Sequence, residues 1–500
     1  MKKKYYLGSD IGTSSCKTVI INKNGKVLGE ASKEYWPTLN NGSAAEIRPD
    51  IWYESFLNTL KNACENANIL PGDICGIGLT GQMVTLVCFD KRGVPLRPAI
   101  LWFDKRGSEY LDNLNINEKE MIRETTCNPI NSTFTLPKLL WLKYHEPYTF
   151  KKIYKILWSS DFIRMKLTGT YYTDMTYASS SLMYDLRKNT WSEEILDLFG
   201  LPKSIFPEIL PASKVVGKIS RDAAIITRLK EGVPVIVGTG DIGADNISAG
   251  IAEAEQGVIR FGTCATISIC SDLPLLDKDD KCPCSSHSIP GLFLIQGTSA
   301  SFGESIRWLK KVFYPDIAGD SNAYKIINKE VSEIGPFSSN ILFHSFTKAA
   351  PYWLDNKKGQ FTGIESNHKR GHFARALFEG ISFDLRVALL NLQKIDGVKI
   401  PGSFIALGGG TNSSELCKIV SNVLGCGLTL VEEVSASMGV AILAVIGINK
   451  IKEQKKYINK IIKYSEEILK DEKLVDFYDG KFKLFKKIYE NLKDISNEFK

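Results

Sequence analysis

Two stretches of the chain share one pattern, in which an apolar strand, a Gly-Thr turn and a second apolar strand follow one another. The first stretch covers residues 5–21 around Gly12, and the second covers residues 256–269 around Gly262. Aromatic and β-branched residues on both sides of a glycine turn are typical of a β-hairpin. The recurrence of this hairpin in the second half of the chain predicts two similar α/β domains, residues 1–250 and residues 251–500.

The turn of the first hairpin has the residues needed to bind phosphate. Gly12 permits close backbone approach, and three hydroxyl side chains lie beside freed backbone N–H groups, namely those of Thr13, Ser14 and Ser15. Asp10 ends the first strand, where a carboxylate can hold Mg²⁺ directly or through water, and Lys17 adds a cation. An ordinary hairpin with glycine and serine in its turn is the alternative, and these residues alone leave it open.

Composition and charge indicate a globular protein without a nucleic-acid or membrane partner. The 500 residues include 63 Lys and Arg against 56 Asp and Glu, a formal net charge of +7. This mild excess is concentrated in Lys-rich stretches near the C-terminus, which predict solvated helix faces. The longest apolar stretch, residues 439–448, is too short to cross a bilayer and predicts a buried helix.

The N-terminus and the cysteines favour a cytoplasmic location. The basic residues 1–4 are followed by an apolar run that Gly8 interrupts at once, which argues against a secretion signal. The 11 cysteines are scattered without a disulfide-like spacing, so reduced thiols are expected. Cys282, Cys284 and His287 form a group typical of metal sites, but they lack a clear fourth ligand, and we expect a surface loop there.

Further elements follow from hydrophobic patterns along the chain. We expect strands at residues 26–35, 74–80 and 403–407, a hairpin formed by residues 84–90 and 96–102, a helix at 52–67, and mainly helices over 136–230 and 450–500. The strand at 74–80 leads into Gln82 and Met83, and the hairpin leads into Asp104. In open α/β sheets, ligands bind at the carboxyl ends of strands. For Asp104 and Arg106, a helix cap with a surface ion pair is the alternative.

The buried strand predicted for residues 233–241 ends in a carboxylate. Asp241 ends this strand, and a helix is expected from Ala244 to Ala249. Asp241 could cap that helix, or it could be a general base that takes the proton of a hydroxyl attacking phosphorus.

These motifs together resemble one family, the FGGY carbohydrate kinases of the actin-like ATPase superfamily, over nearly the whole chain. Residues 10–17 resemble the family's first phosphate motif, and residues 359–364 with 372–379 fit a family signature. Residues 138–142 resemble a second signature, from which Thr133 and Tyr144 depart. Within the family, residues 81–83 and 101–106 resemble those of xylulokinases and similar ketose, polyol or aldonate kinases.

The resemblance implies transfer of the γ-phosphate of ATP to a sugar hydroxyl in a cleft between two RNase H-like domains, with Mg²⁺ as cofactor. It implies that Asp241 is the catalytic base and Asp10 the acid associated with magnesium. The implied phosphate contacts are Thr13, Ser14, Ser15, Lys17, Gly262 and Thr263. The implied nucleotide residues are Gly303, Arg307, Gly409, Gly410 and Asn412. The implied sugar-facing residues, besides Asp241, are Gln82, Met83, Val84, Phe103 and Asp104.

This chain departs from xylulokinases on the sugar side. Val84 replaces a usual histidine, Phe103 a usual asparagine and Ile242 a usual amide residue, so three polar contacts are apolar here. A site built to bind a hydroxyl discriminates strongly against substrates that lack it, so these replacements favour a substrate other than D-xylulose. A small carbohydrate is therefore the expected partner, and a homodimer stays open. A chaperone-like or filament-forming actin relative and a non-catalytic sugar sensor are the alternatives.

Overall fold

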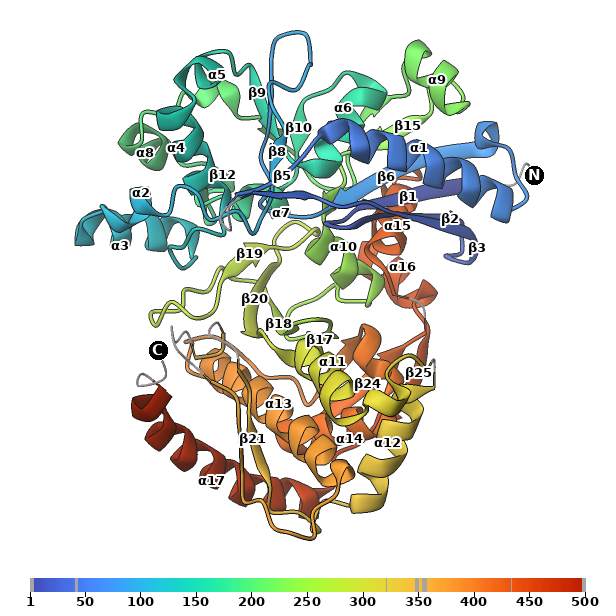
Figure 1. Cartoon of the computed structure of the whole chain (residues 1–500). Coiled ribbons are helices and arrows are strands. Elements are labelled where there is room, and N and C mark those ends of the chain that lie inside the picture. Colours follow the sequence, from blue (N-terminus) through green and yellow to red (C-terminus); the bar gives the residue numbers. More distant parts are fainter. Residues whose placement is uncertain are drawn as a thin grey trace.

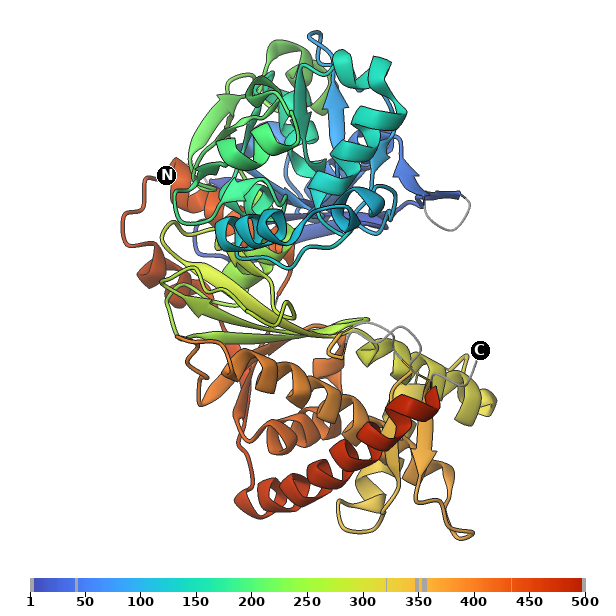
Figure 2. The ribbon, with the colours of Figure 1, turned by 90° about the vertical axis from the view of Figure 1, so that its left-hand side faces the viewer.

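Two mixed α/β lobes, each built around a sheet, make up the computed structural model of the chain (Figures 1 and 2). The structure describes residues 4–40, 44–320, 322–346, 350–352, 358–432 and 434–496. The first sheet has the strand order β14-β15-β6-β1-β2-β3, with β16 beside β6. The strands of this sheet are β1 (Tyr5–Ile11), β2 (Ser15–Asn22), β3 (Val27–Glu34), β6 (Ile74–Gly81), β14 (Val215–Lys218), β15 (Pro234–Ile236) and β16 (Thr239–Gly240).

Alternate residues of β1 bury the two faces of the first sheet. Leu7 packs in the cluster that contains Trp52 of α1 (Pro49–Asn66), whereas Tyr6 packs in the cluster formed by α15 (Ala436–Ile448). Successive side chains of a strand point to opposite faces, so a strand covered on both sides is apolar at every position. This explains why the N-terminal strand is aromatic and aliphatic throughout its first half.

The helix α15 comes late in the sequence but packs on the sheet of the first lobe, beside α10 (Asp241–Ser248) (Figure 1). Glycines make this close approach possible. A Cβ atom would lie 2.0 Å from the Ser437 carbonyl oxygen at Gly8, and 1.8 Å from the Ala244 carbonyl oxygen at Gly439. The buried helix predicted for residues 439–448 is therefore confirmed. Although it belongs to the C-terminal half of the sequence, it covers the first sheet. The boundary near Gly250 stays a prediction.

The second sheet repeats the antiparallel hairpin of the first. Its order is β19-β20-β18-β17-β23-β24-β25, and β17 pairs with β18 as β1 pairs with β2. The two predicted hairpins around Gly12 and Gly262 are thus confirmed. The strands are β17 (Gly257–Phe261), β18 (Ala265–Ser271), β19 (Cys284–Ser286), β20 (Phe293–Ser299), β23 (Ser403–Leu407), β24 (Gly427–Val431) and β25 (Tyr464–Ile468).

Helices and short strands surround these two sheets. The first lobe carries α2 (Glu109–Asp112), α3 (Ile116–Thr126), α4 (Thr135–His145), α5 (Pro147–Lys151), α6 (Ser159–Thr168), α7 (Met175–Ser179), α8 (Glu193–Leu198), α9 (Arg221–Thr227), β4 (Thr38–Asn40), β5 (Ala44–Ile47), β7 (Val87–Phe89), β8 (Ala99–Ile100), β9 (Lys155–Leu157), β10 (Tyr172–Thr173), β11 (Tyr184–Asp185), β12 (Thr190–Trp191) and β13 (Glu208–Ile209). The second lobe carries α11 (Phe302–Phe313), α12 (Ala323–Ile334), α13 (Arg370–Gln393), α14 (Ser414–Leu424), α17 (Glu472–Ser496), β21 (Leu342–His344) and β22 (Gln360–Thr362). The helix α16 (Gln454–Ile461) packs with α15 and the first sheet.

Three expectations about these elements are wrong in part. The hairpin of residues 84–90 and 96–102 is present, but its strands are shorter than predicted. Leu86 and Ile100 exchange backbone hydrogen bonds of 2.9 and 3.0 Å, while β7 also pairs with β9 and β8 with β5. The region of residues 450–500 contains the edge strand β25 as well as helices. Cys282, Cys284 and His287 are buried at the edge of the second sheet, so they do not form a surface loop. No metal-binding group of three or more such side chains occurs within the described ranges.

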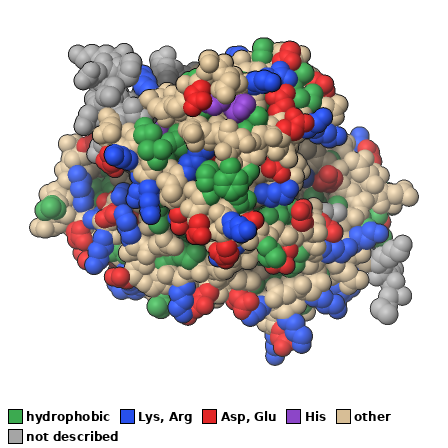
Figure 3. All heavy atoms as spheres, turned by 90° about the horizontal axis from the view of Figure 1, so that it is seen from below, with side chains coloured by type: hydrophobic (Ala, Val, Ile, Leu, Met, Phe, Trp, Pro, Cys, Tyr) green, Lys and Arg blue, Asp and Glu red, His purple; other side chains and the backbone are tan. Residues whose placement is uncertain are grey.

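Charges of both signs are interspersed on the face shown in Figure 3. This mixture agrees with the expectation of solvated helix faces. Among the helices that the structure describes, none is both long and apolar enough to cross a membrane.

Candidate active site

Side chains from outside the first hairpin fix the shape of its turn. The Gly12 N–H donates to the Ser15 carbonyl oxygen at 2.9 Å. The Tyr35 hydroxyl donates to the carbonyl oxygens of Gly12 (2.6 Å) and Ser15 (3.0 Å), and the Gln82 amide nitrogen donates to that of Gly12 (3.2 Å). The turn is therefore held in one conformation before any ligand binds.

The structure brings the sugar-side strand ends to this same turn. The Thr13 hydroxyl lies 3.0 Å from the donating indole nitrogen of Trp102 and 3.5 Å from the Gln82 amide oxygen. Met83 lies against Gly240, where a Cβ atom would be 2.7 Å from the Met83 Cγ. Residues predicted to contact sugar and residues predicted to contact phosphate thus lie side by side.

Two other predicted residues, Asp104 and Lys17, are paired with charged side chains in this structure. The Asp104 carboxylate is buried, accepts from the Ala45 N–H at 2.8 Å and pairs with Arg106 at 2.7 Å. The Lys17 ammonium pairs with Glu30 at 3.0 Å. The ion pair of Asp104 is buried, so the surface ion pair considered as its alternative is wrong. The roles of Asp104 and Lys17 in ligand binding stay predictions.

The second turn closes against the N-terminus of α11. The Gly262 N–H donates to the Cys264 carbonyl oxygen at 2.9 Å, and the Gly303 N–H donates to the Thr263 carbonyl oxygen at 2.9 Å. A Cβ atom at Gly303 would lie 2.4 Å from the Gly262 carbonyl oxygen, so only glycine allows this approach. Helix N-termini favour anions, and here one lies directly behind the predicted phosphate turn.

A cavity of about 410 Å³ gathers all the predicted nucleotide residues of the second lobe. The ring of Phe302, at its wall, stacks on Phe261 with centroids 5.2 Å apart. The predicted residues that line the cavity are Gly262, Thr263, Gly303, Arg307, Gly409, Gly410 and Asn412; Tyr324, Asn328, Phe378 and Leu416 also line it. Apolar walls with a few polar groups are typical of sites for a flat heterocycle.

Leucine at Gly409 is expected to lower ATP affinity by about tenfold or more, because a new side chain would occupy space that a ligand needs. Gly409 lines the cavity, and a Cβ atom there has no protein atom within 4 Å, so folding should be unaffected. Calorimetric titration with an ATP analogue measures the affinity, and thermal denaturation measures the fold. Gly402→Leu, which is equally open but does not line the cavity, is the control. Unchanged affinity in the Gly409→Leu variant would contradict the assignment.

A second cavity, of about 300 Å³, lies between α10 and the second sheet. It shares Gly262 and Thr263 with the 410 Å³ cavity, which is the predicted nucleotide cavity, so this one turn forms a wall of both. The remaining lining residues come from α10 of the first lobe (Ile242, Asp245 and Asn246) and from the second sheet (Val258, Arg260, Cys264, Thr266, Ser268 and Leu407).

Asp241 is the first residue of α10, three residues earlier than the helix start that the sequence predicted. The predicted strand over residues 233–241 is interrupted because Gly238 has a φ of +83°. The Asp241 side chain accepts from the Ile242 N–H at 2.9 Å. Burial raises the pKa of the Asp241 carboxyl to about 6, against the lowering effect of the Arg260 cation and with a further increase from Asp245.

Asp10 faces the same group of charges. Burial, together with the negative charges of Asp241 and Asp245, raises the pKa of Asp10 to about 8. Its Oδ1 atom is buried without a hydrogen-bond partner among the described residues. A buried oxygen in that position is costly unless a ligand satisfies it.

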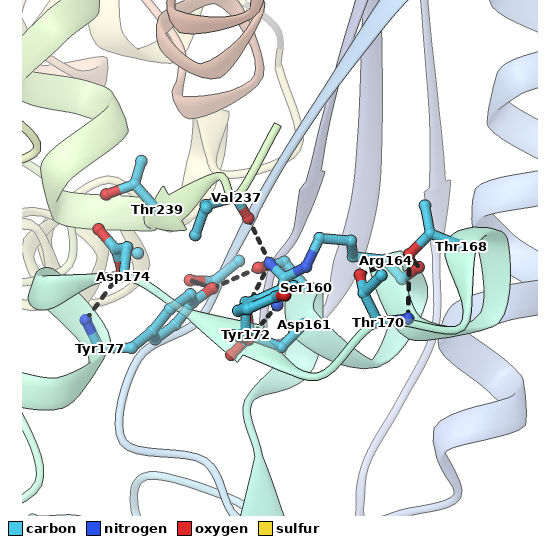
Figure 4. Close-up of polar contacts among 12 residues, drawn as sticks. Ser160, Asp161, Arg164, Thr168, Thr170, Tyr172, Asp174, Tyr177, Val237 and Thr239 are labelled. Atoms are coloured by element: carbon cyan, nitrogen blue, oxygen red, sulfur yellow. Dashed lines mark hydrogen bonds and ion pairs between the residues drawn. The ribbon is translucent and has the colours of Figure 1, made fainter. Parts of the chain in front are cut away.

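A buried ion pair supports the strand that leads to Asp241 (Figure 4). Arg164 pairs with Asp161 at 2.8 Å within α6, and its guanidinium also donates to the carbonyl oxygens of Val237 and Tyr172. The chain between β15 and β16 is thereby tied to the helical part of the first lobe.

Hydroxyl groups continue this support to Gly240, the residue before Asp241. The Asp174 carboxylate accepts from the Thr176 hydroxyl at 2.8 Å and from the Tyr177 N–H at 3.1 Å. The Thr176 hydroxyl in turn accepts from the Gly240 N–H at 2.8 Å and lies 3.0 Å from that of Thr239. Figure 4 shows the hydrogen bond between Tyr177 and Asp174, with Thr239 close to Asp174. The backbone next to Asp241 is therefore held in place by a hydrogen bond from Gly240 to Thr176.

Sequence reasoning missed several of these residues. Asp245 and Arg260 lie on different elements, and only the arrangement of the two lobes brings them together. The spacing of Asp161 and Arg164 fits one face of a helix and could have indicated an ion pair, but not its burial. Trp102 lies within the motif of residues 101–106, but this motif does not predict its hydrogen bond to Thr13.

Comparison with known proteins agrees with this geometry. Residues 5–248 match the N-terminal domain model of the FGGY family of carbohydrate kinases, and residues 257–448 match the C-terminal domain model. A xylulose kinase from Lactococcus lactis is 28% identical over 498 residues, which cover 99% of this chain and 98% of that protein. A glycerol kinase from Malacoplasma penetrans is 30% identical over 443 residues, 84% of each chain.

A solved structure extends the similarity to the whole fold. The crystal structure of xylulose kinase from Rhodospirillum rubrum aligns with a TM-score of 0.89 at 26% identity, covering 99% of this chain and 100% of that one. Both domain models match in order and together span most of the sequence. The chain therefore belongs to the FGGY family of carbohydrate kinases.

Proposed function

We propose that this chain transfers the γ-phosphate of ATP to a hydroxyl of a small sugar, with a ketopentose such as xylulose as the first candidate. One observation carries most of the proposal. The Gly262–Thr263 turn is a wall of the cavity that gathers the predicted nucleotide residues and also of the cavity that reaches α10, which begins with Asp241. A nucleotide held in the first cavity would therefore direct its phosphates toward the predicted base.

The chain's own residues account for the steps of this reaction. Asp241 accepts the proton of the sugar hydroxyl as its oxygen attacks the γ-phosphorus, and the bond from that phosphorus to the β–γ bridging oxygen breaks. The N–H groups of Gly12 and Gly262 are bonded within their turns, so the donors for the phosphate oxygens are the next N–H groups, those of Thr13 and Thr263. Because these groups are fixed beforehand, little reorganisation is needed when charge develops in the transition state.

The residues near Asp10 fit a magnesium ion. The orphaned Oδ1 atom supplies a hard oxygen ligand, and Mg²⁺ in proteins often takes one or two carboxylates while water and substrate phosphates fill the other positions. When bound, the ion would offset charge on the phosphates. We propose Asp10 as the residue that holds it.

Asparagine at position 10 should weaken ATP binding in the presence of magnesium by about tenfold, the lower end of losses seen when metal sites are altered. The amide keeps the shape of the carboxylate but is a poorer ligand, so the variant's affinity should also respond less to the magnesium concentration. Nucleotide titrations at several magnesium concentrations measure both effects. The exposed Asp197→Asn is the control, and a magnesium response equal to that of the unmodified protein would remove Asp10 from the site.

The acceptor can be identified by measuring ADP release with ketoses, alditols and aldonates. Similarity to xylulose kinases favours a ketopentose, whereas the glycerol kinase relative and the apolar residues Val84, Phe103 and Ile242 favour another polyol or an aldonate. ADP release that requires one of these acceptors supports the proposal. Sugar binding without any phosphorylated product would instead support the sensor alternative. The homodimer and the cytoplasmic location stay predictions, and light scattering on the purified protein tests the first.

A further inference from the structure

An ion pair joins the two lobes at the second cavity. Arg260 lies on β17, opposite Thr266 of β18, and its Nη1 atom is 2.5 Å from the Oδ2 atom of Asp245 on α10. The Asp245 side chain is 8% exposed, whereas that of Arg260 is 46% exposed. The carboxylate is thus buried, while part of the Arg260 side chain is exposed and lines the cavity.

The position of Arg260 relates it to the phosphate turn. Arg260 precedes Gly262 by two residues on the strand that leads into the turn, and both residues line the 300 Å³ cavity. The nucleotide cavity lies on the other side of that turn. A triphosphate that crosses the turn from the nucleotide cavity would therefore bring its terminal phosphate to the cavity that contains Arg260.

Arg260 offsets negative charge around this cavity. Burial raises the pKa of Asp10, Asp241 and Asp245, neighbouring carboxylates raise those of Asp10 and Asp241 further, and the Arg260 cation lowers all three. Arg260 is the single cation among the described residues that line the cavity. Without this cation, the negative charges of Asp241 and Asp245 would repel an incoming phosphate.

The geometry of a guanidinium allows Arg260 to serve two partners. The ion pair with Asp245 engages Nη1, and a guanidinium carries five N–H donors in a planar fork. Arginine commonly binds phosphate oxygens through two such donors. A phosphate can therefore be bound while Asp245 keeps the side chain in place.

We propose that Arg260 contacts the transferred phosphoryl group and that Asp245 is the positioning residue that holds it there. This inference rests on the proposed function of the site. The alternative is that the ion pair only ties the lobes together or neutralises Asp245. Two experiments separate these roles, and the first does not require the sugar to be known.

The first experiment compares a non-hydrolysable ATP analogue with ADP in calorimetric titrations. Arg260→Met should lower affinity for the triphosphate by about tenfold, as expected for a charged hydrogen bond, and should change ADP affinity by less than about threefold. An equal loss for both nucleotides would overturn the contact with the terminal phosphate. Absence of nucleotide binding by the unmodified protein would overturn the proposed function itself.

The second experiment is a double-mutant cycle with turnover as the readout. Arg260→Met alone leaves Asp245 as an uncompensated carboxylate, so its effect would mix two causes. Adding Asp245→Asn removes that charge. If Arg260 contacts the phosphoryl group, the double variant should still turn over at least about tenfold more slowly than the unmodified protein. Recovery of full turnover would show that Arg260 only neutralises Asp245, and would overturn the proposal.

A matched control tests whether any lost ion pair has the same effect. Lys455 on α16 pairs with Glu253, and both side chains are well exposed. Lys455→Met should leave the preference for the triphosphate and the turnover unchanged. If Lys455→Met changed the ratio of triphosphate to ADP affinity as much as Arg260→Met does, the effect would come from weaker contact between the lobes. That result would also overturn the proposal.

Discussion

Replacing Asp241 by asparagine is expected to lower turnover by about 100-fold or more while nucleotide binding persists. Asparagine has nearly the same shape but cannot take the proton of the acceptor hydroxyl. Burial raises the pKa of Asp241 to about 6, so the carboxylate is ionised at neutral pH and becomes protonated as the pH falls. In the unmodified protein, turnover should therefore decrease as the pH drops through about 6.

Three measurements check this prediction. Steady-state ADP release gives the turnover, its pH profile shows whether the decrease at low pH disappears in the variant, and titration with an ATP analogue shows whether the nucleotide site is intact. Asp197→Asn, an exposed carboxylate on α8, is the control. Near-normal turnover of Asp241→Asn with the true acceptor would remove Asp241 as the base.

Alanine at Gly439 is expected to destabilise the protein by about 3 kcal/mol, the upper part of the usual range for overpacking. The new Cβ atom would lie 1.8 Å from the Ala244 carbonyl oxygen, so α15 and α10 would have to separate. The midpoint of thermal denaturation should fall by about 3 °C, because unfolding 500 residues carries an entropy of about 1 kcal/mol/K. Because α10 begins with Asp241, turnover should decrease as well.

A glycine in open space provides the matched control. Gly480 lies on α17, and a Cβ atom there has no neighbour within 4 Å. Gly480→Ala should leave stability unchanged or raise it by up to about 1 kcal/mol, because alanine restricts the unfolded chain. If Gly439→Ala melted at the same temperature as the unmodified protein, the close packing of α15 on α10 would be contradicted.

The elements that the sequence predicted well are those specified by neighbouring residues. Each of the two hairpins carries its own turn glycine. Likewise, α6 ends at Gly169, whose φ of +73° is the left-handed cap conformation that glycine favours. The residues of the second lobe that the family resemblance assigns to the nucleotide also line one cavity, although their binding role stays a prediction. Local rules suffice where the deciding contacts are close in sequence.

The sequence failed where distant partners decide. β25 is polar at most positions, so only its pairing with β24 makes it a strand. The predicted hairpin of residues 84–102 forms, but the sequence did not indicate that β7 would also pair with β9 and β8 with β5. Arg260 is one polar residue in an apolar strand, and without the position of Asp245 it has no evident role. Each of these features depends on how separate parts of the chain are placed in space.

The late position of α15 affects how the nascent chain can fold. The helix spans Ala436–Ile448, yet it covers the face of the first sheet that includes Tyr6, Val19 and Ile21. During synthesis, the N-terminal hairpin leaves the ribosome hundreds of residues before its covering helix does. Until then that apolar face remains uncovered, and such surfaces are prone to aggregation. The first lobe should therefore depend on chaperones while it is being made, and a fragment that ends near residue 250 should be insoluble.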